Sequence, residues 1–287
     1  MSAEAGSESQ LGLRACRELA AALAAHPGGI EQFVRKLDRQ RVPYLSYSKV
    51  ACVEFCPHRY RLEYVQVVKL WPEPAYFVKG RAFHKAAARY YEDIGRGRTT
   101  RSHTFERLAR RSGNDEADRQ HLCNAIHLLR ENVMDGWKVV AVEQPFVLSL
   151  GRGMPPCIGV VDLVLRKDGV YAVIDHKTGK SFGNTDAMQL ALYRKYVQRR
   201  HRAKECIAYF DQYRWVNNLD RIRKPAFRRT KARLTDSSWD VAVRRFRRAE
   251  KEIERVEAGR LGRTRGMCYM CRYRDVCDES TGSSYRW

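Results

Sequence analysis

Hydrophobic and polar residues alternate along this chain with two different periods. Apolar positions recur three or four residues apart in several stretches, which predicts helices. These stretches are 11–40, 46–69, a segment starting near Gly80, 114–135, 184–202 and 237–258. Short runs of Val, Ile and Leu bounded by Gly and Pro predict strands instead. These are 138–150, 157–166, 170–176 and 205–214. The order predicts an α/β core with helical parts before and after it.

Proline divides the first two helical stretches. Pro27-Gly28-Gly29 interrupts the first, so we expect a helical hairpin that packs on the main body. Pro57 disfavours a helical conformation at Cys56, which places Cys56 between two helical pieces. The predicted organisation is a helical N-terminal extension (1–43), one main domain (44–280) and a tail (281–287).

Positive charge is spread through the chain. Its 54 Lys and Arg residues outnumber its 33 Asp and Glu residues, which gives a formal net charge of +21. The basic residues alternate with apolar positions, which favours a folded surface for nucleic acid over a merely solvated basic surface. The apolar run 19–25 is short and follows charged residues, so we expect neither a signal peptide nor a membrane partner.

The nine cysteines, without a secretory signal, predict a reducing compartment, the cytoplasm. Three of them, Cys268, Cys271 and Cys277, lie within ten residues, and Cys56 is a candidate fourth ligand. By spacing alone such a set could hold zinc or an iron-sulfur cluster. Cys52 is a rival for the fourth position because it lies one helical turn away. The others are expected to be small core residues: Cys16, Cys123, Cys157 and Cys206.

Two acids and a lysine lie inside predicted strands, where unpaired charge is costly. Asp175 and Lys177 point to the same face of their strand, and Asp162 lies on the strand before it. A Mg²⁺ or Mn²⁺ ion between the two carboxylates would remove their repulsion. The alternative is that both acids pair with arginines in a structural network.

The order and context of these residues resemble the PD-(D/E)XK nuclease superfamily, and within it the RecB-like exonucleases. The resemblance rests on four elements: Gly80-x-x-x-His84, Gly159-x-x-Asp162, Asp175-x-Lys177 and Gln189-x-x-x-Tyr193. It implies a restriction-endonuclease-like mixed central sheet flanked by helices. It also implies that His84, Asp162 and Asp175 hold the metal, that Lys177 acts in catalysis, and that Gln189 and Tyr193 position the substrate strand. Glu143 resembles an acid often found near the first strand of the family, with ordinary surface exposure as the alternative.

The cysteines extend this resemblance over about residues 44–278. One cysteine before the nuclease motifs and three after them resemble the iron-sulfur clasp of AddB-type and CRISPR-associated exonucleases. The resemblance implies that a [4Fe-4S] cluster on Cys56, Cys268, Cys271 and Cys277 joins the helical N-terminal and C-terminal parts. Zinc at the same four cysteines is the alternative.

The function expected from these features is metal-dependent hydrolysis of DNA, as a single-stranded DNA exonuclease in repair, recombination or CRISPR or phage DNA processing. Basic residues are expected to flank the substrate groove: Arg199, Arg200, Arg202, Arg228, Arg229, Lys231 and Arg233. A helicase or a CRISPR integration complex would be a separate partner. The alternative function is a non-catalytic iron-sulfur or zinc nucleic-acid-binding module that acts as the partner of a helicase or an integrase.

Overall fold

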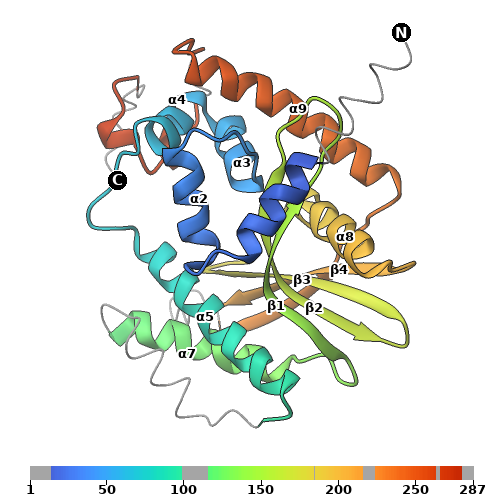
Figure 1. Ribbon diagram of the computed structural model, residues 1–287. Coiled ribbons are helices and arrows are strands. Elements are labelled where there is room, and N and C mark those ends of the chain that lie inside the picture. Colours follow the sequence, from blue (N-terminus) through green and yellow to red (C-terminus); the bar gives the residue numbers. More distant parts are fainter. Residues whose placement is uncertain (1–13, 99–115, 184, 216–223, 263–265, 280–287) are drawn as a thin grey trace, which may run out of the picture. The chain divides into compact units, whose positions relative to one another are not determined.

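The computed structural model describes residues 14–98, 116–183, 185–215, 224–262 and 266–279 (Figure 1). The predicted tail, 281–287, lies outside these residues. The chain divides into two compact units. The first unit comprises Met1–Pro72, Pro145–Gly159 and Asp240–Trp287, and the second comprises Glu73–Gln144 and Val160–Trp239.

A five-stranded sheet forms the centre of the fold. Its strands are β1 (Lys138–Leu148), β2 (Cys157–Lys167), β3 (Val170–Gly179), β4 (Cys206–Arg214) and β5 (Ala226–Lys231), and they are hydrogen-bonded in that order. The β2–β3 and β4–β5 pairs are antiparallel, whereas β3 and β4 are parallel. The mixed sheet flanked by helices confirms the predicted restriction-endonuclease-like fold class.

Helices cover both faces of the sheet within the second unit. On one face, α5 (Ala75–Gly95) contacts β3 while α7 (Glu116–Glu131) contacts β4 and β5, and the two helices lie side by side (Figure 1). Their core cluster includes Phe83, Leu122, Leu163 and Ile174. On the other face, α8 (Ala187–His201) contacts β3 and β4. Because α8 also connects these parallel strands, the sequence from β3 to β4 is a βαβ unit.

The strand β5 was not predicted. It is a short edge strand whose sequence, Ala226-Phe-Arg-Arg-Thr-Lys231, contains three cations and no regular alternation of apolar residues. Charged residues are common on edge strands because they prevent pairing with a further strand. The same charges hide the strand from an analysis based on hydrophobic periodicity.

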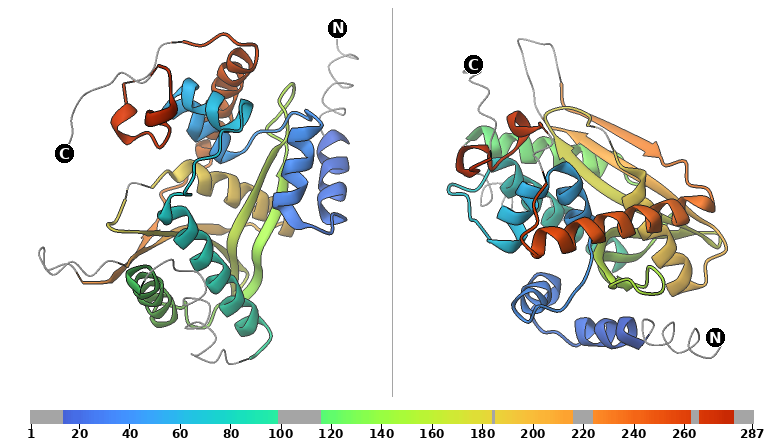
Figure 2. Two further views of the ribbon diagram at one scale, coloured as in Figure 1. Left: turned by 90° about the vertical axis from the view of Figure 1, so that its left-hand side faces the viewer. Right: turned by 90° about the horizontal axis from the view of Figure 1, so that it is seen from above.

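The first unit is mainly helical (Figure 2). Its elements are the helical residues 14–24, α2 (Gly29–Arg39), α3 (Tyr47–Phe55), α4 (Pro57–Tyr60), the π-helical turn η1 (Arg61–Val65), most of α9 (Ser237–Glu257), and the 3₁₀ turns η3 (Cys268–Met270) and η4 (Arg274–Val276). The helices on either side of residues 27–28 pack with Tyr44 and Ile158 in one apolar cluster, as expected for a hairpin on the main body.

Local sequence explains how this unit places Cys56. The Ser46 side chain accepts a hydrogen bond from the backbone N–H of Lys49 at 3.1 Å and so caps the start of α3. Cys56 then has an extended backbone, with φ −166° and ψ 127°, before Pro57 begins α4. This confirms the junction predicted from the Cys-Pro pair. In the described part of the chain, no helix is both long and apolar enough to cross a lipid bilayer.

Candidate active site

The candidate active site lies where β2 and β3 separate. Their described ladder ends with Leu163 opposite Ile174. Beyond that pair, the Asp162 carboxylate accepts a hydrogen bond from the backbone N–H of His176 at 2.8 Å. The side chain thus satisfies a buried backbone donor at the point where the ladder ends. This contact holds Asp162, which is 8% exposed, in a fixed position.

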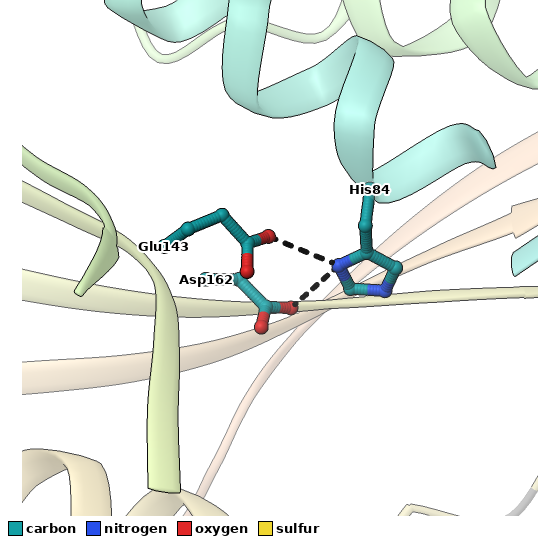
Figure 3. A group of neighbouring side chains, drawn as sticks. All are labelled: His84, Glu143 and Asp162. Atoms are coloured by element: carbon teal, nitrogen blue, oxygen red, sulfur yellow. Dashed lines mark hydrogen bonds and ion pairs between the residues drawn. The ribbon is translucent and has the colours of Figure 1, made fainter. Parts of the chain in front are cut away.

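Three side chains meet at this point from three elements. His84 comes from α5, Glu143 from β1 and Asp162 from β2, and their ligand atoms all lie within 4.8 Å of one another (Figure 3). The His84 Nδ1 atom is 3.4 Å from Glu143 Oε1 and 3.6 Å from Asp162 Oδ2. Two carboxylates and an imidazole can ligate a divalent cation such as Mn²⁺ or Mg²⁺. His84 and Glu143 are partly exposed, so the group is accessible from solvent.

Glu143 has an uncommon backbone conformation. Its φ of +44° lies in the left-handed region, although it is not a glycine and belongs to a strand. Such a residue costs roughly 1–3 kcal/mol, and strained residues of this kind cluster at functional sites. The conformation agrees with a functional role for Glu143, as does its place in the group of three. Its role as a metal ligand stays a prediction.

A second set of side chains forms a continuous chain of contacts beside this group. Lys177 Nζ is 2.7 Å from Asp175 Oδ2 and donates to Gln189 Oε1 at 3.0 Å. Gln189 Nε2 in turn donates to the Tyr193 hydroxyl at 2.8 Å. Alternation along β3 brings Asp175 and Lys177 to the face that α8 covers, and the four-residue spacing brings Gln189 and Tyr193 together. The structure thus brings these four residues together, while their catalytic roles stay predictions.

Burial and like charge dominate the electrostatics of the site. Burial raises the pKa of Asp175 to about 6 although Lys177 opposes the shift, and burial together with Glu143 raises the pKa of Asp162. Burial alone would lower the pKa of His84, but Asp162 and Glu143 raise it to about 9. Ionised carboxylates are therefore costly here without a cation, and a divalent ion would offset that cost.

Asp175 is held differently from Asp162. Asp175 forms an ion pair with Lys177. The three residues whose ligand atoms lie within 4.8 Å of one another are His84, Glu143 and Asp162, and they do not include Asp175. Asp175 is 1% exposed, and its negative charge contributes to the raised pKa of His84. The prediction that Asp175 is a metal ligand therefore remains a prediction, as does that for His84.

The opposite face of β3 carries a buried polar network that the sequence did not reveal. His176 lies opposite Asp211 in the β3–β4 register, and its Nδ1 atom is 3.2 Å from the Tyr213 hydroxyl. Asp211, which is fully buried, accepts two hydrogen bonds from Arg229, each of 2.7 Å. The structural acid–arginine pair considered as an alternative for Asp162 and Asp175 thus occurs at Asp211 instead.

This pair corrects one expectation about the basic residues. Arg229 was expected to flank the substrate groove, but its guanidinium is held by Asp211 and by the Asn132 carbonyl at 2.9 Å. Successive residues of a strand face opposite sides, so Arg228 lies on the other face. The two neighbouring arginines therefore have different environments, and only Arg228 shares a face with Lys177 through the pairing of β3, β4 and β5.

Four cysteines gather in the first unit. Cys56, Cys268, Cys271 and Cys277 line one small cavity between α4 and the C-terminal turns, which lie side by side in Figures 1 and 2. Burial raises the pKa of the Cys271 thiol, and the nearby thiols of Cys56 and Cys277 contribute to the shift. None of the four cysteines is in a disulfide, so the donor set fits a thiolate-bound metal centre.

Cys52 is placed differently from these four. Its thiol is buried and donates to the Glu63 carboxylate at 3.5 Å, and it does not line the cavity. Cys56 is therefore the better candidate ligand, although ligation itself stays a prediction. Cys157 and Cys206 are buried, whereas Cys16 and Cys123 are only partly so.

Comparison with known proteins gives a family and a fold. The model of the PD-(D/E)XK nuclease superfamily matches residues 44–278, and no curated relative matches the chain. A solved structure from Eubacterium rectale, described as a "putative exonuclease", is 14% identical, with a TM-score of 0.52 over 82% of this chain and 90% of its own. At that identity the likeness shows the fold alone. The structure of SSO0001 is 15% identical over 79% of this chain and 96% of its own, with a TM-score of 0.31.

The family match includes the predicted catalytic residues and the four clustered cysteines. It spans most of the chain, and the five-stranded mixed sheet agrees with the fold of that family. The chain belongs to the PD-(D/E)XK nuclease superfamily, whose members hydrolyse phosphodiester bonds and typically use Mg²⁺ or Mn²⁺.

Proposed function

We propose that this protein is a RecB-like, metal-dependent exonuclease that degrades single-stranded DNA. The observation that carries the proposal is the convergence of His84, Glu143 and Asp162 beside the ion pair of Asp175 and Lys177. A group of oxygen and nitrogen ligands next to a lysine suits hydrolysis of a phosphodiester, because developing negative charge needs compensation. The net charge of +21 suits a polyanionic substrate.

Each residue of the site has a role in this proposal. A bound Mg²⁺ or Mn²⁺ would polarise the phosphate and lower the pKa of water. His84, Glu143, Asp162 and Asp175 supply the candidate ligands. Lys177 is the only cation in the chain of contacts, and its pKa is raised by Asp175 and Asp162 against the effect of burial, so it stays protonated. A protonated Lys177 can orient the attacking water or stabilise the charge on the phosphate. Gln189 accepts a hydrogen bond from the lysine, and Gln189 and Tyr193 position the substrate strand near the metal.

The proposed cofactor of the first unit is a [4Fe-4S] cluster on Cys56, Cys268, Cys271 and Cys277. The gathering of these four cysteines around one cavity, without a disulfide between them, supports the proposal. The cluster would join α4 to the C-terminal turns, so its role is structural. Zinc at the same cysteines is the alternative. Cysteines without disulfides suit a reducing compartment, the cytoplasm, where a helicase or a CRISPR integration complex would supply single-stranded DNA.

The test is a time course with end-labelled DNA in Mg²⁺ or Mn²⁺, using anaerobically prepared protein. Linear single-stranded, linear duplex and circular single-stranded substrates are compared. We expect release of label from the linear single strand and no cleavage of the circle. Lys177→Ala should lose activity, whereas Lys204→Ala, which removes an exposed charge before β4, should not.

Two outcomes would reject the proposal in different ways. Cleavage of the circular strand, which has no ends, would show that the protein is an endonuclease and not an exonuclease. No cleavage of any substrate, with metal-independent DNA binding retained, would favour the alternative of a non-catalytic iron-sulfur or zinc module that binds nucleic acid for a helicase or an integrase.

A further inference from the structure

A polar row crosses the sheet from the candidate active site to its edge. Lys177 pairs with Gln212 in the parallel β3–β4 register, and Gln212 pairs with Arg228 in the antiparallel β4–β5 register. Paired residues of neighbouring strands point to the same face. Lys177, Gln212 and Arg228 therefore share the face on which the catalytic chain of contacts lies. At about 4.8 Å per strand, Arg228 is roughly 10 Å from the lysine, a length that a nucleic-acid strand covers in a few nucleotides.

Gln212 organises the outer part of this row. It is 4% exposed, and both ends of its amide are used. Its Oε1 atom accepts from Arg228 Nε at 2.9 Å and from Nη2 at 2.5 Å, while its Nε2 atom donates to the Gly183 carbonyl at 2.9 Å. A buried side chain thus fixes both an arginine and the loop that links β3 to α8.

Two arginine guanidinium groups lie against the ring of Phe182 in that loop. Arg228 lies with its Cζ atom 4.5 Å from the centre of the Phe182 ring, and Arg214 lies 5.1 Å from it. Arg214 also donates from Nε and Nη2 to the Lys224 carbonyl, at 3.0 and 2.8 Å. Stacking on an aromatic ring together with bidentate hydrogen bonds holds an arginine side chain in one orientation at little entropic cost.

The positive charges of these two arginines are not neutralised by a carboxylate within the described residues. Both are held by neutral oxygens, those of Gln212 and Lys224. Arg229 and Arg245, by contrast, form ion pairs with Asp211 and Glu54. A fixed guanidinium that keeps its full charge is suited to bind phosphate.

We propose that Arg214 and Arg228, fixed on Phe182, bind backbone phosphates of the DNA strand next to the scissile bond. This inference rests on the proposed function, since it names how the same site holds its substrate. This platform, formed by Arg214, Arg228 and Phe182, contacts phosphates rather than base edges, so its binding is independent of DNA sequence. It places the strand along the row that ends at Lys177.

The test measures DNA binding without cleavage, so that it does not depend on catalysis. Fluorescence anisotropy with a labelled single-stranded oligonucleotide is recorded in EDTA from about 50 to 200 mM salt. The slope of log K against log salt is negative, and each lost phosphate contact reduces its magnitude by about 0.7 for a single strand. The Arg214→Gln/Arg228→Gln variant should therefore reduce this magnitude by about 1.4. Arg228→Lys should keep the slope, because it keeps the charge.

The matched control removes two charges elsewhere in the same unit. Arg166 and Lys167 are exposed at the β2–β3 turn, and Arg166 likewise stacks on an aromatic ring, that of Tyr171. Arg166→Gln/Lys167→Gln should leave the slope unchanged. An equal loss of slope in both double variants would overturn the proposal, because it would show an effect of net charge alone. An unchanged slope in the Arg214→Gln/Arg228→Gln protein, with its circular dichroism intact, would overturn it as well. If wild type binds DNA with the expected slope but cleaves no substrate, the catalytic function fails while this platform stands.

Discussion

Two kinds of buried carboxylate lie on the central sheet, and mutation should separate them. Asp211 is fully buried and forms two 2.7 Å hydrogen bonds with Arg229. Asp175 is 1% exposed and pairs with a lysine beside the candidate metal ligands. We predict that Asp211 stabilises the fold without acting in catalysis, and that Asp175 acts in catalysis without stabilising the fold.

The burial of the Asp211–Arg229 pair sets the expected size of the first effect. Removing one partner of a buried ion pair costs about 3–5 kcal/mol, because the remaining charge has lost its compensation. Arg229→Met should fall at the lower end of that range, because burial already raises the pKa of Asp211 and the unpaired acid can take up a proton. A cost of about 3 kcal/mol lowers Tm by roughly 6–12 °C in a domain of this size. The double variant Asp211→Asn/Arg229→Met should be more stable than the sum of the two single changes predicts.

The assays are urea unfolding at pH 7.5 and cleavage of end-labelled single-stranded DNA at 20 °C, where all variants are folded. Arg229→Met should keep its cleavage rate per folded molecule. Asp175→Asn should lose at least about a hundredfold in rate. It should change the free energy of unfolding by less than about 1 kcal/mol, because the Lys177 side chain left behind is 43% exposed and its charge can be hydrated, and because burial already disfavours the ionised form of Asp175. The reasoning is refuted if Arg229→Met costs less than about 1 kcal/mol, or if Asp211→Asn abolishes cleavage while the protein remains folded.

Three further predictions concern other parts of the molecule. Glu143→Gln should weaken Mn²⁺ binding, measured by calorimetry, by at least about tenfold, and unchanged affinity would exclude Glu143 as a ligand. Gly159→Ala would place a Cβ atom 2.6 Å from Phe146 Cζ and should cost roughly 1–3 kcal/mol in urea unfolding, with partial recovery when Phe146→Leu is added; a neutral single variant would contradict the close packing. Iodoacetamide should label Cys271 only after the metal centre is removed by a chelator, whereas Cys157, buried and with a raised pKa, should stay unlabelled before and after; labelling of Cys271 in the metal-loaded protein would argue against its ligation.

The elements predicted best from the sequence are those in which one physical signal dominates. Most helices with regular apolar spacing and the strands rich in Val and Ile occur within a few residues of the predicted bounds, although the helix predicted to begin near Gly80 begins at Ala75. The extended backbone at Cys56 followed from proline alone. Alternation along β3 was enough to place Asp175 and Lys177 on one face, because the strand period is strict.

The features that were missed depend on contacts between distant segments. The strand β5 has no periodic apolar signal, and its arginines differ only because Arg229 meets Asp211 across the sheet. The buried pair of His176 and Tyr213 needs the parallel register of β3 and β4. The positive φ of Glu143 is a property of the backbone that residue identity does not reveal, because glutamate rarely adopts it.

The two candidate metal centres are built from separate parts of the chain. The four cysteines belong to the first unit, and His84, Glu143, Asp162, Asp175 and Lys177 belong to the second. Each of these two sets of residues thus lies entirely within one unit. If the proposed cluster binds the four cysteines, it brings together segments more than two hundred residues apart, and closing so long a loop is where a covalent clasp stabilises a fold most. In this proposal the cysteine centre would support the fold around it without supplying a ligand to the catalytic ion, so one chain could use thiolates at one site and carboxylates at the other.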